Sequence, residues 1–194
     1  MIEKFTNKIA KWLYLKNAIS YSDIELYSYG IYSLVLTFIP LILACSIGAI
    51  MKKPLNGLEI VIVFMVLRKF SGGYHSKSLL VCFLYSSILL FLCIWASISI
   101  IFNYKIIIIT IFFGIILIII SPMDSVHRRI DKQERIFYKK IVMGCVLLFL
   151  IIMFIFYMYK RNNEALNISI GIILTSILLI IGNIDNKIKE KYKR

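Results

Sequence analysis

LLVCFLYSSILLFLCIWASISIIF, residues 79–102, contains no charged side chain. About 20 apolar residues in a helix cross the hydrocarbon core of a bilayer, which is about 30 Å thick. Residues 141–159 form a second run of this kind. The whole chain of 194 residues is 60% hydrophobic, above the ~45–50% that is typical of soluble domains. We therefore predict an all-α, polytopic membrane helical bundle.

The same criterion predicts about six membrane segments. The second is short, since about 12 residues give a helix of only ~18 Å. It either thins the bilayer, borrows Phe70 and its neighbours, or is re-entrant, and four spans plus re-entrant segments are the alternative. Pro40 is expected to kink the first segment. The predicted segments are residues 29–51, 57–68, 79–102, 105–120, 141–159 and 166–183.

The N-terminal region has a different pattern. Apolar residues at helical spacing alternate with lysines, as in a helix lying in the headgroup region. Ser22–Glu25 has the spacing of a capping box and predicts the start of a second short helix. No cleavable signal peptide is expected. The predicted organisation is one integral membrane domain, residues 1–194: interfacial amphipathic helices at 1–28, the membrane bundle at 29–183 and a basic cytoplasmic tail at 184–194.

The net charge of +13 is distributed unevenly along the chain. If the N-terminus is cytoplasmic, 18 of the 23 Lys and Arg residues fall in inner segments and five in outer loops, as the positive-inside rule requires. This places residues 68–78 and 121–140 at the cytoplasmic face of the cell membrane. In a membrane protein such charge favours anionic lipids and an acidic peptide as partners, and no nucleic acid.

Histidine and cysteine are the side chains that could carry chemistry. The only two histidines, His75 and His127, both fall in predicted cytoplasmic segments. The four cysteines form no CxxC pair, so the sequence predicts neither a zinc ribbon nor a disulfide framework. Cys45 and Cys93 lie deep in their segments and are expected to be packing residues.

The stretch RKFSGGYHSKSLLVC, Arg68–Cys82, combines a base, a thiol and a glycine pair at one membrane boundary. Thiolate is the reactive form of cysteine, and a helix N-terminus stabilises it. Histidine is the usual base that activates such a thiol. The alternative is that Cys82 is a small buried hydrophobe and His75 an interfacial polar residue. Cys145, which follows the loop containing His127, is the competing nucleophile.

Together, Arg68, Gly72-Gly73, His75 and Cys82 resemble the motif of the accessory gene regulator B (AgrB-type) family. These are membrane cysteine endopeptidases that process the precursors of quorum-sensing peptides. The resemblance extends over nearly the whole chain, through the amphipathic N-terminus, the order of the spans and the loop SPMDSVHRRIDKQERIFYKK. That loop departs from the family at Ile130, where relatives often carry proline.

The resemblance implies that Cys82 is the nucleophile and His75 its base, with Arg68, Gly72 and Gly73 as supporting residues. Ser78 is one candidate for the group that orients His75. The others are Asp124, Asp131 and Glu134, and each of the four is otherwise a helix cap or a surface charge. The basic residues after the fourth segment are by default a positive-inside signal, and alternatively they bind the precursor: Arg128, Arg129, Lys132, Arg135, Lys139 and Lys140.

The implied reaction removes the C-terminal tail of a small amphipathic precursor of the AgrD type through a thioester. An internal cysteine or serine of the precursor then closes a thiolactone or lactone. No metal or organic cofactor is implied, and relatives work as homodimers. The main alternative is a non-catalytic membrane transporter or exporter component, which would need charged residues along a pathway in its spans. A lipid-modifying enzyme and a non-enzymatic peptide-binding partner of a sensor kinase are the others.

Helix geometry adds one further expectation. In a continuous helix, His75 and Cys82 would share a face but lie about 10.5 Å apart along the axis, too far for direct proton transfer. The sequence therefore predicts a break at Gly72–Gly73, with the third segment starting at Ser76–Ser78 and a serine as its N-cap. The residues containing His75 would then fold back over the first turn of that helix.

Overall fold

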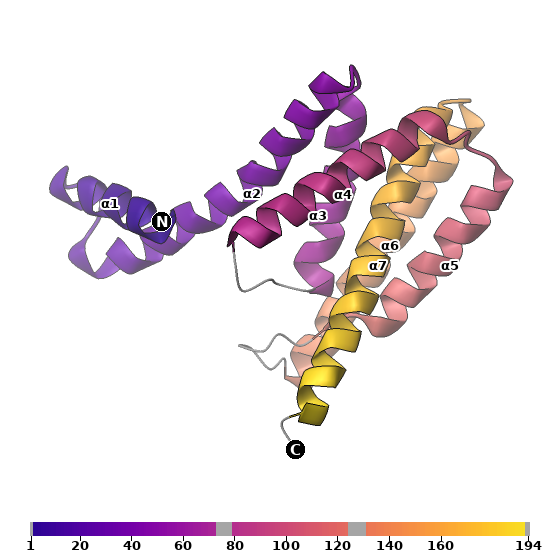
Figure 1. Ribbon diagram of the computed structural model, residues 1–194. Coiled ribbons are helices and arrows are strands. Elements are labelled where there is room, and N and C mark those ends of the chain that lie inside the picture. Colours follow the sequence, from indigo (N-terminus) through magenta and orange to yellow (C-terminus); the bar gives the residue numbers. More distant parts are fainter. Residues whose placement is uncertain (1, 73–78, 124–130, 193–194) are drawn as a thin grey trace. The chain divides into compact units, whose positions relative to one another are not determined.

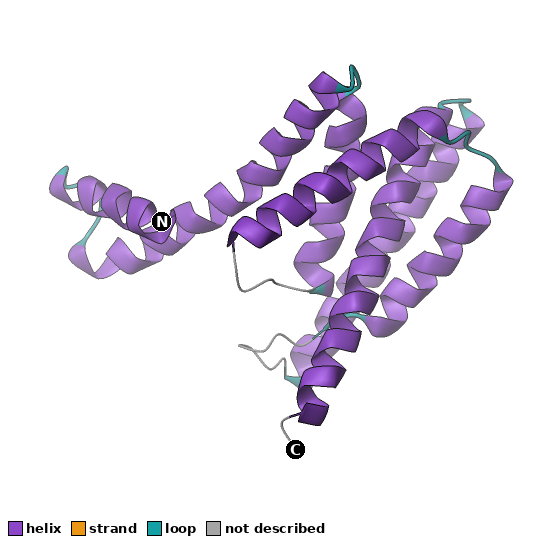
Figure 2. Cartoon of the chain, viewed as in Figure 1, coloured by secondary structure: helices purple, strands orange, loops and turns teal. Residues whose placement is uncertain are grey.

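The structure is a computed structural model of the chain. It describes residues 2–72, 79–123 and 131–192, apart from the side chains of residues 2–4, 36, 79–83, 132 and 189–192. Helices and the turns between them account for the described residues, and no strand occurs among these (Figure 2). The predicted all-α bundle is confirmed.

In the described parts of the chain, six α-helices follow an N-terminal α-helix, one for each predicted membrane segment (Figure 1). The order along the described parts of the chain is α1 (Ile2–Leu15), the 3-10 helix η1 (Tyr21–Asp23), α2 (Ile24–Ile50), α3 (Pro54–Ser71), α4 (Leu79–Ser99), α5 (Tyr104–Ile120), α6 (Lys132–Met158) and α7 (Asn162–Tyr192).

The chain packs as two compact units, residues 1–43 and 44–194. In the first unit, α1 lies against the start of α2. The hydroxyls of Thr6 and Ser28 are 3.4 Å apart, and the rings of Tyr14 and Tyr21 meet edge to face at 5.7 Å. Trp12 stays exposed on α1. An exposed aromatic side chain between lysines is what an interfacial helix requires.

A helix starts within Ser22–Glu25, as predicted, but it is not a second short helix. Ser22 lies in η1, and its hydroxyl donates to the neighbouring Asp23 carboxylate at 3.3 Å instead of capping a helix. From Ile24 the chain continues as one helix to Ile50, with Pro40 inside it. No glycine or proline lies between Ile24 and position 29, so the helix begins five residues before the predicted start of the first segment.

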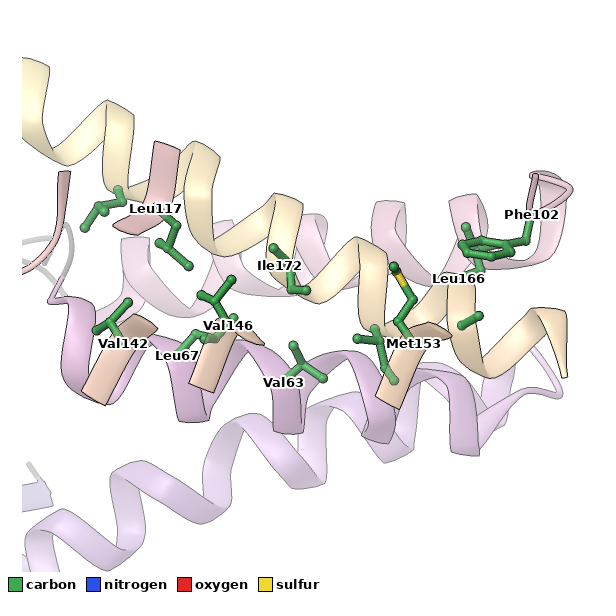
Figure 3. Close-up of a cluster of buried hydrophobic side chains, with 12 residues drawn as sticks. Val63, Leu67, Phe102, Leu117, Val142, Val146, Met153, Leu166 and Ile172 are labelled. Carbon is green, nitrogen blue, oxygen red and sulfur yellow. The ribbon is translucent and has the colours of Figure 1, made fainter. Parts of the chain in front are cut away.

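Helix α7 is the centre of the second unit. In its most apolar window 72% of the residues are buried, compared with 17% in α6. It packs against α3, α5 and α6, which surround it in Figure 1. Figure 3 shows the resulting core, where Val63 and Leu67 of α3 and Val146 of α6 point toward Ile172 of α7.

Two glycines allow the helices of this unit to approach closely. A Cβ atom at Gly57 of α3 would lie 2.6 Å from the carbonyl oxygen of Ala44 in the last turns of α2. A Cβ atom at Gly171 of α7 would lie 2.7 Å from the Cβ of Val63. Helix α3 is therefore held on two sides at distances that only glycine permits.

The second predicted segment, 57–68, is longer than expected. Helix α3 has 18 residues, about 27 Å at 1.5 Å per residue. It continues past its predicted end because its cationic side chains lie along the helix. The guanidinium of Arg68 sits over the ring of Phe64 at 5.3 Å, and the ammonium of Lys69 over that of Phe70 at 5.7 Å. Helix α3 thus includes Phe70, and how it meets the bilayer stays a prediction.

The third predicted segment, 79–102, ends earlier than expected, at Ser99. Asn103 caps the next helix, since its side-chain oxygen accepts from the N–H groups of Lys105 and Ile106 at 3.0 and 3.3 Å. Phe102 is buried, and its ring packs edge to face on that of Tyr157. The apolar run therefore includes a connection, with Phe102 buried and Ile100 and Ile101 exposed, as well as a helix.

Helices α6 and α7 extend beyond their apolar segments at the ends rich in basic residues. Within the described residues, the windows Tyr21–Ile50, Gln133–Met158 and Asn162–Ile188 are long and apolar enough to cross a membrane. Residues 84–99 and 104–120 form shorter apolar helices. The chain is a membrane protein, and the choice between six spans and four spans with re-entrant segments stays a prediction.

Candidate active site

The motif residues fall at the junction between α3 and α4. Arg68 occupies the last turn of α3, which ends at Ser71. Cys82 is the fourth residue of α4, one turn from its first described residue, Leu79. Gly73, His75 and Ser78 lie outside the described residues, and the side chain of Cys82 is among those not described.

The helix breaks at Gly72, as the glycine pair predicts. Its φ is +76° and its ψ −164°, a conformation that side-chain-bearing residues rarely adopt. The chain is therefore not one helix from Phe70 to Cys82. The predicted serine N-cap at residues 76–78 lies outside the described residues.

The segment that follows α5 packs against this glycine. The N–H of Met123, three residues after α5, donates to the carbonyl oxygen of Ser71 at 3.0 Å. The carbonyl oxygen of Met123 occupies the other side, 2.9 Å from where a Cβ at Gly72 would lie. The Ser71 hydroxyl donates to the Gly72 carbonyl oxygen at 3.3 Å. Gly72 is thus required both by its φ and by the backbone beside it.

The segment that carries Met123 is itself fixed. The N–H and the hydroxyl of Ser121 both donate to the carbonyl oxygen of Leu117, at 3.0 and 2.7 Å. Ser121 and Ser71 are both buried. Leu117 of α5 and Leu67 of α3 belong to one buried cluster, visible at the left of Figure 3. The ends of α3 and α5 are consequently held together.

This contact joins the last described residues before two predicted regions. Gly72 is the last described residue before the motif residues 73–78. Met123 is the last described residue before the basic loop. Of the predicted precursor-binding residues, Arg135, Lys139 and Lys140 are exposed on the first turns of α6. Arg128 and Arg129 lie outside the described residues, together with Asp124 and His127, and the side chain of Lys132 is not described.

The other cysteines have different surroundings. Cys45 is exposed on α2, and Cys93 and Cys145 are half-buried. Cys145 is a side chain packed against the buried core of the second unit. Cys93 is 11 residues beyond Cys82 on the same helix, about 16 Å along its axis. These positions are those of packing or lipid-facing residues.

Sequence reasoning missed Glu59, an acidic residue inside α3 that lies within the predicted span. Its carboxylate accepts a hydrogen bond from the side-chain amide of Asn167 in α7 at 2.7 Å. Asn167 is buried, and its amide oxygen has no hydrogen-bond partner. An ionisable residue inside a predicted span that pairs with another helix marks a candidate functional position. The signal was present, since Glu59 interrupts an apolar run.

Comparison with known proteins decides the family. The family model described as accessory gene regulator B matches residues 2–180. The chain belongs to the AgrB family. It is 29% identical to an AgrB-like protein of Clostridium perfringens strain SM101 over 181 residues. The aligned region covers 82% of this chain and 83% of the relative. A second AgrB-like protein, from strain 13 of that species, is 27% identical over 147 residues. The alignment covers 70% of this chain and 67% of that relative. No solved structure matches the chain.

Membership in the AgrB family has direct consequences. It supports a role in the accessory gene regulator quorum-sensing system, and the family is known for peptide processing. It also implies a peptide precursor of the AgrD type as a partner. Together with the long apolar helices, it supports a membrane protein that takes part in this processing.

Proposed function

We propose that this chain is a membrane cysteine endopeptidase that removes the C-terminal tail of an autoinducing-peptide precursor and promotes closure of its ring. Cys82 is the nucleophile and His75 its base. The observation that supports this assignment is the break after α3, where Gly72 takes a φ of +76°. A continuous helix would separate the two residues by about 10.5 Å, whereas a chain that turns at Gly72 is free to fold back toward the start of α4.

The position of Cys82 favours nucleophilic chemistry. It is the fourth residue of α4, about 4.5 Å along the axis from Leu79. The exposed N–H groups of a first helical turn stabilise negative charge, and therefore the thiolate form of a cysteine. Apolar residues follow Cys82 directly. A nucleophile there is close to the aqueous phase while its inner side faces a water-poor environment.

The reaction proceeds by two acyl transfers. His75 takes the thiol proton, and the Cys82 thiolate attacks the carbonyl carbon of the scissile peptide bond. The C–N bond breaks, the leaving amine takes the proton from His75, and the precursor remains bound as a thioester. An internal cysteine thiol of the precursor then attacks that thioester, its proton passes to the departing Cys82 sulfur through His75, and a thiolactone forms.

Ring closure in this scheme requires no ATP. A thioester is exchanged for a thioester, so the second step is close to energy-neutral, and a serine hydroxyl would give a lactone in the same way. The step competes with hydrolysis, so water must be kept away from the acyl-enzyme. The site near the cytoplasmic face of the cell membrane, formed in a homodimer as in the family, would meet this requirement.

The function is tested with the purified protein in liposomes and a precursor-type peptide. Tail release is expected without ATP or added metal. A precursor whose internal cysteine is replaced by alanine should lose its tail and accumulate as a thioester-linked adduct, which neutral hydroxylamine releases. Tail release with no adduct trapped even when the reaction is quenched within the first turnover would contradict covalent catalysis.

The exposed basic residues at the start of α6 are proposed to hold the acidic tail of the precursor and anionic lipid headgroups. Replacing Arg135, Lys139 and Lys140 together by glutamine should weaken precursor binding. Exposed ion pairs contribute about 0.2–1 kcal/mol each, so we expect a loss of about threefold to about 160-fold. Binding to the unchanged protein should also weaken with salt, since the screening length is ~10 Å at 0.1 M.

The matched control removes three basic residues in the predicted outer turns, with glutamine at Lys52, Lys53 and Lys160. It carries the same net charge as the first variant and should bind the precursor normally. Affinity that is insensitive to salt, or an equal loss in both triple variants, would rule out the tail-binding role.

The second candidate function is a non-catalytic transporter or exporter component. Glu59, hydrogen-bonded to Asn167 inside the bundle, is the observation that favours it, since transport pathways use such residues. A transporter would keep its function when Cys82 is replaced by alanine and lose it when Glu59 is replaced by glutamine. The endopeptidase would show the opposite pattern.

A further inference from the structure

We infer that Met123 is a positioning residue for the proposed His75–Cys82 site. This inference rests on the proposed function and deepens it. It concerns a contact between residues 71–72 and residue 123, which are about 50 positions apart in the sequence.

The backbone of Met123 holds the turn at Gly72 from two directions. Its N–H donates to the carbonyl oxygen of Ser71, the last residue of α3, at 3.0 Å. Its carbonyl oxygen fills the space beside the Gly72 Cα, where a Cβ would lie only 2.9 Å away. The direction in which the chain leaves α3 is therefore set by Met123.

The Met123 backbone can do this because it is anchored in turn. Ser121 is buried and tied twice to the Leu117 carbonyl oxygen, and Pro122 is buried beside it. Leu117 packs in the core of the bundle with Leu67, one turn before Ser71. The position of Gly72 is thus fixed by the segment after α5 as well as by the end of α3.

One consequence follows for the reaction. His75 lies three residues after Gly72, so its approach to Cys82 depends on the direction of the chain at Gly72. A misplacement of about 1 Å at reacting groups costs about 10²-fold in rate. Loss of the Met123 contact should therefore lower kcat and leave precursor binding unchanged.

The test compares two substitutions of one residue. Met123→Pro removes the N–H that bonds to Ser71, whereas Met123→Ala keeps it. For the folded fraction of each protein in liposomes, Met123→Pro should lower kcat for tail release by about 10²-fold with an unchanged KM. Met123→Ala should stay within about twofold of the unchanged protein. The triple variant at Arg135, Lys139 and Lys140 should show the reverse split, with KM raised and kcat kept.

A second variant covers the case in which Met123→Pro does not fold. Gly72→Ala places a Cβ against the Met123 carbonyl oxygen and should lower kcat with KM unchanged. Gly144→Ala is its control, since nothing lies within 4 Å of a Cβ at that position. An unchanged kcat in Gly72→Ala, or in folded Met123→Pro, would overturn the inference.

The contact itself is tested by a disulfide. A Cβ at position 72 would lie 3.6 Å from the Met123 Cβ, within the ~3.5–4.5 Å that disulfides require. In a protein whose four cysteines are serine, Gly72→Cys with Met123→Cys should crosslink under mild oxidation, and Gly72→Cys with Lys52→Cys should not. Absence of the first crosslink would refute the contact. If Cys82→Ala stays active, the proposed function fails. If Cys82→Ala is inactive while folded Met123→Pro retains kcat, only the positioning role of Met123 is wrong.

Discussion

Replacing Cys82 by alanine is expected to abolish precursor cleavage while the protein remains folded and inserted in the membrane. Without a thiol at this position no acyl-enzyme can form, and the covalent route is closed. Serine at this position should also be inactive, because a hydroxyl is a much poorer nucleophile than a thiolate. His75→Ala should lower the cleavage rate by about 10²–10⁴-fold, the usual contribution of a general base. Tail release by the purified variants in liposomes is the measurement.

The remaining cysteines provide the matched controls. Serine at Cys45, Cys93 or Cys145 should leave cleavage close to that of the unchanged protein. Cys45 is exposed on α2, and Cys145 packs against the buried core. Small polar replacements there affect packing rather than the reaction. Inactive Cys145→Ser combined with active Cys82→Ser would show that Cys145, with His127, is the nucleophile.

The helices were predictable because apolar runs of sufficient length have few other solutions in a membrane. Their ends were less predictable, because charge does not end a helix. Arg68 and Lys69 remain in α3 with their side chains over neighbouring rings, and α6 begins at Lys132, nine residues before the apolar run. The early start of α2 at Ile24 has the same origin, since nothing near it breaks a helix.

At the candidate site, the sequence predicted the turn at Gly72, because a turn depends on the residues that form it. A glycine pair predicts a turn, and Gly72 has the positive φ that such a turn requires. The partner of that turn was not predictable, since the backbone of Met123 contacts it through peptide groups that every residue carries. The pairing of Glu59 with Asn167 escaped for a similar reason: the two are 108 residues apart, and only the packing of α3 on α7 brings them together.

Replacing Gly171 by leucine is expected to disrupt the bundle. Even the first side-chain atom would lie 2.7 Å from the Cβ of Val63 and 3.1 Å from the carbonyl oxygen of Ile60. Both contacts belong to α3, and the backbone oxygen cannot rotate away. Overpacking of a close interface costs typically 1–3 kcal/mol even for small additions, and leucine adds three more carbon atoms. We expect most of the protein to lose its monodisperse peak in gel filtration in detergent, and Gly171→Ala to melt at a lower temperature.

The same replacements at Gly144 separate packing from helix propensity. Gly144 is also inside a long helix, but a Cβ there meets no atom within 4 Å. Alanine and leucine favour a helix over glycine by up to about 1 kcal/mol, so Gly144→Ala and Gly144→Leu should be as stable as the unchanged protein or more so. At Gly171 the same gain is outweighed by the contact with α3. Helix α3 leads directly to Gly72, so a weaker contact between α3 and α7 would also loosen the turn before His75. Gly171→Ala should therefore cleave the precursor more slowly per folded molecule than Gly144→Ala. Equal melting temperatures for the two alanine variants would mean that α3 and α7 are not in close contact in the membrane.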